Sequence, residues 1–289
     1  MIRIGVRSFV AGGEPYIGVL DTYTGAAAAY SLRLLRTAYT GSAIRVRRSS
    51  DNTEQDIGFN SSGGLDTTAL TTFCGAGNGF VTTWYDQSGN GRNATQSTAN
   101  NQPRIVNAGT IEKENNVPIV VFDGSNDFLN ASGSYSLATG SVFGTIKSIV
   151  DTNAKTIFSR SSTTVSSNNR EFFNYIANSR YDLQVGSGAS FPTAFKTYTT
   201  TNYSLFTGII QGATSTMSNY INSSIGTTAT SLSTTLTGTI VTSIGVVYQL
   251  TSPSFYMNGK IGEIIVYPSN QSSNRTGIES NINTYYGIY

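Results

Sequence analysis

The sequence predicts an all-β fold, a jelly-roll sandwich with one or two short edge helices and a short C-terminal helix. Short segments with apolar residues at alternate positions recur along most of the 289 residues, and clusters of Gly, Asn and Ser separate them. Closely spaced strands with turn residues between them are typical of sandwiches, not of alternating strand–helix units. Hydrophobic residues make up 38% of the chain, with 17 Tyr and 14 Phe, so a large core is available.

The first elements along the chain predict an arm followed by a domain. Residues 1–24 begin with "IRIGVRSFV", whose weak alternation predicts a strand, and the turn residues of "GGEPY" follow. We expect this segment to be an attachment arm that adds a strand to the sheet of a neighbour. Residues 25–289 then form one jelly-roll domain, because no linker or change of composition divides them.

Three segments have helical spacing or a helix start signal. The apolar residues of "AAAAYSLRLLRTA" predict a helix over 26–38. A second, shorter helix is predicted over 66–74, with Asp66 as its N-cap. Near the end, "NRTGIESNINTYYGIY" places Ile278 and Ile282 on one helical face, which predicts a short closing helix. The main predicted strands between these helices contain the segments "AIRVRRS", "GFVTTWYD", "VPIVVFDG", "GSVFGTIKSIV", "REFFNYIA", "YSLFTGIIQG" and "GKIGEIIVY".

The composition excludes several classes of function. The net charge is only +2, with 12% charged residues, so no basic field indicates nucleic-acid binding. The chain has no His, which excludes Ser-His-Asp catalysis, and the single Cys74 cannot form an internal disulfide. We therefore expect no metal centre and no cofactor. The N-terminus lacks the features of a signal peptide, and no apolar run approaches the roughly 20 residues of a membrane span, so membrane insertion is not expected.

The densest polar motif is "WYDQSGNGRNATQ", residues 84–96. Asp86 is placed to accept backbone N–H groups of the turn that follows, and Gly89 and Gly91 suit positive backbone φ angles. The beginning of the motif also looks like a calcium loop, but no Glu follows at the distance that an EF-hand requires. The interpretation we favour is a structural turn; a cation site of another kind and a catalytic loop are the alternatives.

Two sets of motifs carry a resemblance to known families. "VVFDGSNDFL" (120–129) and the "GKIGEIIVY" strand with its closing helix resemble concanavalin A/laminin-G-like jelly rolls. The stretch from "AYSLRLLRTAYTGSAIRVRRSSDNTEQDIG" through "YDQSGNGRNATQ", about residues 26–108, resembles the catalytic domain of the α-L-arabinofuranosidase B family, itself a jelly-roll sandwich. The combination also resembles jelly-roll modules of phage tail, fibre and other virion proteins.

The arabinofuranosidase resemblance implies where catalytic carboxylates would stand. Glu171 falls roughly where the family has its nucleophile, but its flanking residues differ from the family motif. The interpretation we favour for Glu171 is a solvated charge at the end of a strand. The place of the general acid is taken by Val246 or Val247, and a valine cannot protonate a leaving group. Asp182 is the one candidate to replace it. Glu263 alternates with apolar neighbours in "GKIGEIIVY" and is expected on an exposed strand face. We therefore expect no catalysis.

The resulting functional expectation is a phage virion structural module on the tail, a fibre or the capsid surface, without catalysis. Its expected partners are other virion proteins, further copies of this chain and possible cell-surface glycans. Sugar rings stack on aromatic side chains, and the candidate glycan-binding residues are Tyr175, Tyr181, Tyr203 and Tyr248. The alternative is a glycoside hydrolase related to α-L-arabinofuranosidase with a degenerate active site.

Overall fold

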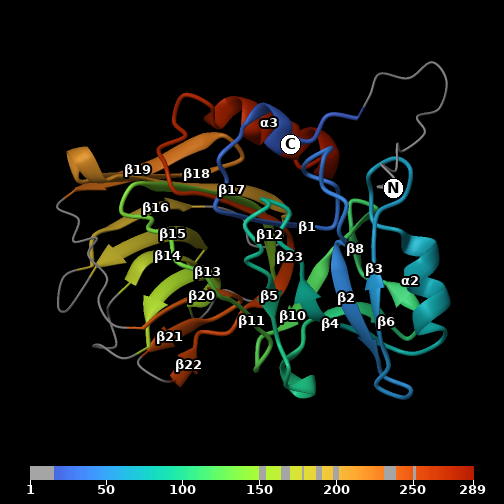
Figure 1. Ribbon diagram of the computed structural model, residues 1–289. Coiled ribbons are helices and arrows are strands. Elements are labelled where there is room, and N and C mark those ends of the chain that lie inside the picture. Colours follow the sequence, from blue (N-terminus) through green and yellow to red (C-terminus); the bar gives the residue numbers. More distant parts are fainter. Residues whose placement is uncertain are drawn as a thin grey trace.

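The computed structural model describes residues 16–149, 154–163, 170–177, 179–186, 191–197, 202–230, 239–249 and 252–289. The strands in these residues pair antiparallel and form two sheets that face each other (Figure 1). The sheets are joined through β6, which pairs with both β10 and β4. The predicted all-β sandwich with few short helices is confirmed.

The first sheet is built around two long central strands, β12 and β23, which pair over most of their length. Its order is β19, β18, β17, β12 and β23, and both β1 and β10 pair with the other edge of β23. The bounds are β19 (Ser224–Thr230), β18 (Thr216–Ile221), β17 (Ser204–Gln211), β12 (Gly140–Ser148), β23 (Asn258–Tyr267), β1 (Ala28–Ser31) and β10 (Val120–Asp123).

The second sheet carries the strands on which the candidate carboxylates lie. Its order is β16, β15, β14, β13, β20, β11, β5, β4, β2 and β3. The bounds are β16 (Thr193–Thr197), β15 (Arg180–Gly186), β14 (Arg170–Ala177), β13 (Lys155–Ser162), β20 (Ile240–Ile244), β11 (Leu129–Ala131), β5 (Ala94–Thr95), β4 (Gly79–Trp84), β2 (Ile44–Arg48) and β3 (Glu54–Ile57).

Short elements connect and flank the two sheets. The remaining strands are β6 (Arg104–Asn107), β7 (Thr110–Ile111), β8 (Lys113–Glu114), β9 (Val117–Pro118), β21 (Val247–Gln249) and β22 (Ser252–Ser254). The helices are α1 (Val19–Thr22), α2 (Thr67–Cys74) and α3 (Arg275–Tyr286), with one-turn 3-10 helices at Ala99–Asn101 and Gly212–Thr214. None of the helices in the described ranges is long and apolar enough to cross a membrane.

The main core lies between the two sheets. Strands of the second sheet supply Phe158, Phe172 and Leu183, and strands of the first supply Phe206 and Ile264, all fully buried. The Phe158 and Phe172 rings meet edge to face, with centroids 6.0 Å apart. Alternate residues of each strand thus fill one interior, as the period-two pattern predicted.

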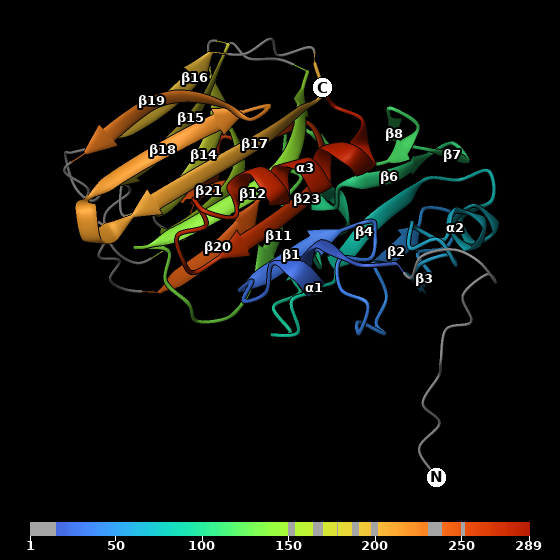
Figure 2. The same ribbon diagram turned by 90° about the horizontal axis from the view of Figure 1, so that it is seen from above.

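Helix α3 adds a third layer on the outer face of the first sheet, across β17, β12, β23 and β1 (Figure 2). Its Ile278, Ile282 and Tyr286 recur every four residues and pack on Phe143 and Ile265 in a second apolar cluster. The helix ends at Gly287, whose φ of 59° suits glycine. The closing helix predicted from the same spacing is confirmed. The helix predicted over 66–74 is also confirmed and is observed as α2. The side chain of its N-cap, Asp66, accepts a hydrogen bond from the Ala69 amide at 2.9 Å.

The helix predicted over 26–38 is wrong, because Ala28–Ser31 forms strand β1 against β23. Ala28 and Tyr30 face the core between the sheets, whereas Ala29 faces the cluster beneath α3. A strand that is buried on both faces is apolar at every position. Periodicity alone therefore does not distinguish it from a buried helix.

The part of the predicted arm that the structure describes, residues 16–24, packs on the domain. Val19 and Leu20 of α1 are buried, and the Leu20 amide donates to the Leu35 carbonyl at 2.9 Å. Residues 1–15 lie outside the described residues. The attachment role of residues 1–24 and the boundary before 25–289 stay predictions.

Candidate functional site

The two candidate catalytic carboxylates lie on neighbouring strands but far apart along them. Asp182 on β15 stands opposite Tyr175 on β14, whereas Glu171 comes four residues before Tyr175, at a bulge near the start of β14. Four strand residues span about 13 Å at about 3.3 Å each, and the bulge shortens this only in part. The carboxyl groups of glycosidases lie about 5–9.5 Å apart. The strand register therefore does not bring Glu171 and Asp182 together as a catalytic pair.

Glu171 is held in a buried ion pair. Its Oε2 accepts from Arg160 Nε at 2.6 Å, and its Oε1 accepts from the Ala138 amide at 3.1 Å and from the Ser136 hydroxyl. Arg160 also donates to the Tyr135 carbonyl and stacks over the Tyr135 ring, 4.4 Å from its centroid. Both carboxylate oxygens are thus bound by protein donors. This environment stabilises a structural charge and leaves no open approach for a sugar.

Asp182 has a different environment. It is buried, and Arg180 donates to its two oxygens at 3.1 Å from Nε and Nη2. Burial raises the pKa of Asp182, while the Tyr175 hydroxyl and Arg180 act in the opposite direction. A raised pKa is the direction of shift that a general acid needs. Asp182 is therefore the better candidate of the two for chemistry.

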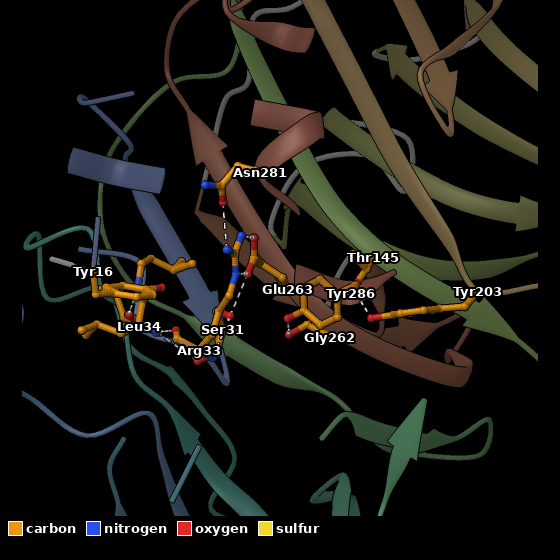
Figure 3. A network of polar contacts seen from close by, with 12 residues as sticks. Tyr16, Ser31, Arg33, Leu34, Thr145, Tyr203, Gly262, Glu263, Asn281 and Tyr286 are labelled. Atoms are coloured by element: carbon orange, nitrogen blue, oxygen red, sulfur yellow. Dashed lines mark hydrogen bonds and ion pairs between the residues drawn. The ribbon is translucent and has the colours of Figure 1, made fainter. Parts of the chain in front are cut away.

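The other carboxylates of the second half are also committed to buried contacts. Glu263, expected on an exposed face, is fully buried, so that expectation is wrong. It accepts from Arg33 Nε at 2.7 Å, from Arg33 Nη2 at 2.9 Å and from the Ser31 hydroxyl at 2.8 Å. Helix α3 is the reason, because it covers this face of β23 and its Asn281 accepts from Arg33 at 2.8 Å (Figure 3). Glu279 of α3 pairs with Arg275 at 2.5 Å. Asp151 lies outside the described residues.

Val246 and Val247 are fully buried at the end of β20 and the start of β21. The Val246 carbonyl accepts from the Ser159 hydroxyl at 2.8 Å. Two apolar side chains thus occupy the place where the family resemblance implies a general acid.

The four tyrosines chosen as glycan contacts do not form one surface. Tyr181 belongs to the core between the sheets and Tyr203 to the cluster beneath α3, so the expectation that these two contact a glycan is wrong. Both side chains are buried because another part of the chain covers the face of the sheet on which they lie. Tyr203 donates to the Thr145 hydroxyl at 2.7 Å in the network of Figure 3. Tyr175 and Tyr248 are half-buried.

Tyr248 lies beside a cavity of about 540 Å³. Its hydroxyl accepts from Asn130 Nδ2 at 2.9 Å, and its ring meets that of Phe128 edge to face. Asn130 and Phe128 both line the cavity, together with Thr95 and Gln96. Hydroxyl, amide and aromatic groups of this kind are suited to binding saccharides.

The loop at Asp86 is organised by its carboxylate. Oδ1 accepts from the amides of Ala29 and Ser88, both at 2.9 Å, and Oδ2 accepts from the Arg92 amide at 2.9 Å. Gly89 and Gly91 have φ angles of 95° and 70°. The buried carboxylate thereby ties the loop to β1, which is a geometric role. In the described ranges no group of three or more acidic or Cys side chains could hold a metal ion.

Sequence reasoning did not identify a second cavity, of about 650 Å³, that contains Asp123 and Asp127. The motif "FDGSNDF" served only to support a family resemblance. Its two carboxylates, four residues apart in a tight turn, are the signal that indicates this site.

Comparison with known proteins relates the chain to arabinofuranosidases. Residues 20–128 match the family described as "Alpha-L-arabinofuranosidase B, catalytic". A probable α-L-arabinofuranosidase B of Aspergillus flavus is 36% identical over 90 residues, which is 31% of this chain and 16% of that protein. The Aspergillus niger relative is 32% identical over 98 residues, 34% of this chain and 20% of that protein. The match thus spans a fifth or less of these relatives.

Solved structures share the fold over most of the chain. An arabinofuranosidase in complex with arabinofuranosyl-α-1,2-xylobiose aligns with a TM-score of 0.66 and 16% identity, covering 94% of this chain and 64% of that one. A GH54 α-L-arabinofuranosidase soaked with a cyclic sulfate inhibitor aligns with a TM-score of 0.64 and 15% identity. The alignment covers 94% of this chain and 65% of that one. The predicted resemblance of the N-terminal third is confirmed. The prediction of a phage virion structural protein is wrong, because the matches point to arabinofuranosidase glycoside hydrolases instead.

Proposed function

We propose that this chain is an arabinofuranosidase-related protein that binds polysaccharides bearing α-L-arabinofuranosyl groups through a β-sandwich whose catalytic centre is degenerate. The observation that carries the proposal is the extent of the likeness. Sequence similarity to α-L-arabinofuranosidases covers residues 20–128, and similarity of fold to arabinofuranosidase structures covers 94% of the chain.

The contacts of the carboxylates support binding without hydrolysis. A retaining mechanism needs a nucleophile that is open to the sugar ring and an acid about 5–5.5 Å away. Glu171 is saturated by three protein donors, and Val246 and Val247 supply no titratable group. Binding, in contrast, needs only hydroxyl, amide and aromatic side chains around a cavity, and these line the space next to Tyr248.

A second candidate function is glycoside hydrolysis with Asp182 as the proton donor. It is favoured by the direction of the pKa shift of Asp182, because a general acid that protonates the leaving oxygen of a glycosidic bond needs a raised pKa. This candidate requires a second carboxylate or a water-activating group within about 10 Å of Asp182.

Two measurements on the full chain separate these functions. Affinity electrophoresis in gels that contain arabinoxylan measures binding, and release of 4-nitrophenol from 4-nitrophenyl α-L-arabinofuranoside measures hydrolysis. We expect retardation in the gel and no release above a blank. Release that disappears in Asp182→Asn but persists in Glu171→Gln would establish the second candidate. If the gel shows no retardation and the assay shows no release, both candidate functions are overturned.

A further inference from the structure

The cavity at Asp123 and Asp127 combines an apolar wall with buried polar groups. Phe80 of β4, Val121 of β10 and Ile149 supply the apolar part. Ile149 is 59% exposed, which is unusual for a large aliphatic side chain in this protein. Arg47 stacks over the Phe80 ring, 4.9 Å from its centroid, and thereby fixes the ring at the edge of the cavity.

The turn that joins β10 to β11 supplies the polar part. The Asp123 amide donates to Asp127 Oδ2 at 2.9 Å, while Asp123 Oδ1 accepts from the amides of Ser125 and Asn126. Among the described residues these bonds use one oxygen of each carboxylate, which leaves the other for a ligand. Asn126 Oδ1 is buried and has no hydrogen-bond partner there. Asn258 stands directly opposite Asp123 in the β10–β23 ladder and also lines the cavity.

Asp127 is a buried carboxyl group close to the negative charge of Asp123. Asp127 is only 5% exposed, and burial together with the charge of Asp123 raises the pKa of Asp127 to about 7. Strongly shifted carboxyl groups inside a cavity are more frequent at binding and catalytic sites than elsewhere. A ligand hydroxyl that donates to the second oxygen of Asp127 would add a hydrogen bond to this carboxylate. Arg47 and Arg104 also line the cavity, so its walls carry charges of both signs.

The cavity lies next to the one beside Tyr248. The segment that separates them, residues 96–102, is held by Gln102, which accepts from Arg47 Nε at 2.7 Å and donates to the Gln96 carbonyl at 3.0 Å. Gln96 lines the smaller cavity and Gln102 the larger. Two polar cavities on either side of one segment fit a chain of several sugars better than a single monosaccharide. Their volumes, about 540 and 650 Å³, are typical of ligand sites.

We propose that the cavity formed by Phe80, Asp123, Asp127 and Asn258 is a saccharide-binding site, distinct from the β14–β15 strands where the family resemblance implies catalysis. Asp127 accepts a hydroxyl of a neutral sugar, the side-chain amide of Asn258 binds a second hydroxyl, and Phe80 packs against the apolar face of the ring. The site rests on the proposed function, since it names where in this chain the polysaccharide binds.

The test compares Asp127→Asn and Phe80→Ala with Asp51→Asn as the matched control, an exposed carboxylate that lines neither cavity. Asp182→Asn is measured beside them as a probe of the β14–β15 strands. Isothermal titration with arabinofuranosyl-α-1,2-xylobiose and with unsubstituted xylobiose gives the affinities, and thermal melting verifies that each variant is folded. At pH 8, above the raised pKa of Asp127, we expect Asp127→Asn to weaken binding about tenfold, because an uncharged amide replaces the charged acceptor of the sugar hydroxyl. We expect Phe80→Ala to weaken it about fivefold, while Asp51→Asn binds like the wild type.

The possible outcomes distinguish a failure of the site from a failure of the proposed function. If the wild type binds and only Asp182→Asn weakens binding, the site at Asp127 is wrong while the proposed function stands. If xylobiose binds as tightly as the arabinosylated probe and depends on Asp127, the site stands and the arabinofuranosyl preference fails. No binding of either probe overturns both proposals. Stabilisation by Ca²⁺ alone that Asp127→Asn abolishes, without saccharide binding, would make this a cation site and overturn the saccharide site.

Discussion

Two buried arginine–glutamate pairs in different parts of the molecule have the same chemistry but suggest opposite interpretations from sequence. Arg33–Glu263 lies beneath α3 on the first sheet, and Arg160–Glu171 lies in the second sheet, with Nε–Oε distances of 2.7 and 2.6 Å. Glu263 alternates with isoleucines like a surface charge, while Glu171 falls near the place of a catalytic nucleophile. In the structure both are saturated structural ion pairs. Burial and partners, not position in a motif, decide what a carboxylate does.

The difference between the two pairs lies in what surrounds them. Arg33 is held by Glu263 through two nitrogens, by Asn281 of α3 and by the Tyr285 ring, 4.9 Å from the guanidinium carbon. Arg160 donates to Glu171 through one nitrogen only, Nε, and its other two nitrogens donate to the Thr242 hydroxyl and the Tyr135 carbonyl. The first pair links a helix to a sheet, so its loss should affect the whole third layer. The second is expected to be weaker.

Breaking the first pair should have the largest effect. Glu263→Ala leaves the buried Arg33 charge without a partner, so the free energy of unfolding should fall by about 3–5 kcal/mol. Urea denaturation measures it. The control is Glu54→Ala, which removes the exposed partner of Arg45 and should change stability by less than about 1 kcal/mol. Equal effects of the two substitutions would contradict the importance of burial.

Breaking the second pair tests whether Glu171 is structural. Glu171→Gln keeps an oxygen for Ser136 and Ala138 but removes the charge that faces Arg160, so we expect a loss of about 2–3 kcal/mol. Saccharide binding should be unchanged under conditions in which the variant is fully folded. If denaturation shows no loss of stability while hydrolytic activity disappears, Glu171 is a functional group and the comparison of the two pairs fails.

The Asp86 loop provides a carboxylate that binds only neutral donors. Asp86→Ala leaves the buried amides of Ala29, Ser88 and Arg92 without an acceptor, which should lower stability by about 1–3 kcal/mol. Chelation with EDTA should leave the melting temperature of the wild type nearly unchanged. A drop of many degrees on chelation would show that a cation, and not these amides, is the main partner of the loop.

The smallest effect concerns Asp127, which forms no ion pair within the described part of the chain. Its pKa is raised from the usual 3.8 to about 7, so the folded chain binds more protons than the unfolded one between these values. Stability is therefore highest below about pH 4 for this group and falls as the pH rises through 7, by on the order of 1 kcal/mol in an open, solvent-screened cavity. Denaturation at pH 5 and pH 8 measures this slope.

Two variants sharpen the pH measurement. Asp127→Asn should flatten the slope, and Asp182→Asn should flatten a smaller part of it, because burial raises the pKa of Asp182 as well. An unchanged slope in Asp127→Asn would mean that Asp127 titrates normally and that its pairing with Asp123 is not destabilising.

Caps and short-range spacing in the sequence correctly predicted those helices and strands that neighbouring residues define. The N-cap at Asp66 and the four-residue spacing of Ile278 and Ile282 identified α2 and α3, and alternation identified the strands. The same rules failed at Ala28–Ser31, because a segment buried on both faces has no polar face to reveal its period. For the site, the sequence singled out Glu171 and Asp182 but not Asp127, since cavity walls come from strands distant in the chain.

The sequence by itself determined an all-β sandwich, the absence of histidine chemistry and the likeness of its N-terminal third to arabinofuranosidases, because composition, short-range periodicity and local motifs are sufficient for these. Only the tertiary structure decided that Glu171 and Glu263 are ion-paired inside the protein, that Tyr181 and Tyr203 are core residues and that Asp123 and Asp127 line a cavity. The physical reason is that burial depends on what covers a face. Helix α3 (Arg275–Tyr286) and much of the facing sheet come from parts of the chain distant from β1 (Ala28–Ser31), and no local pattern records their position.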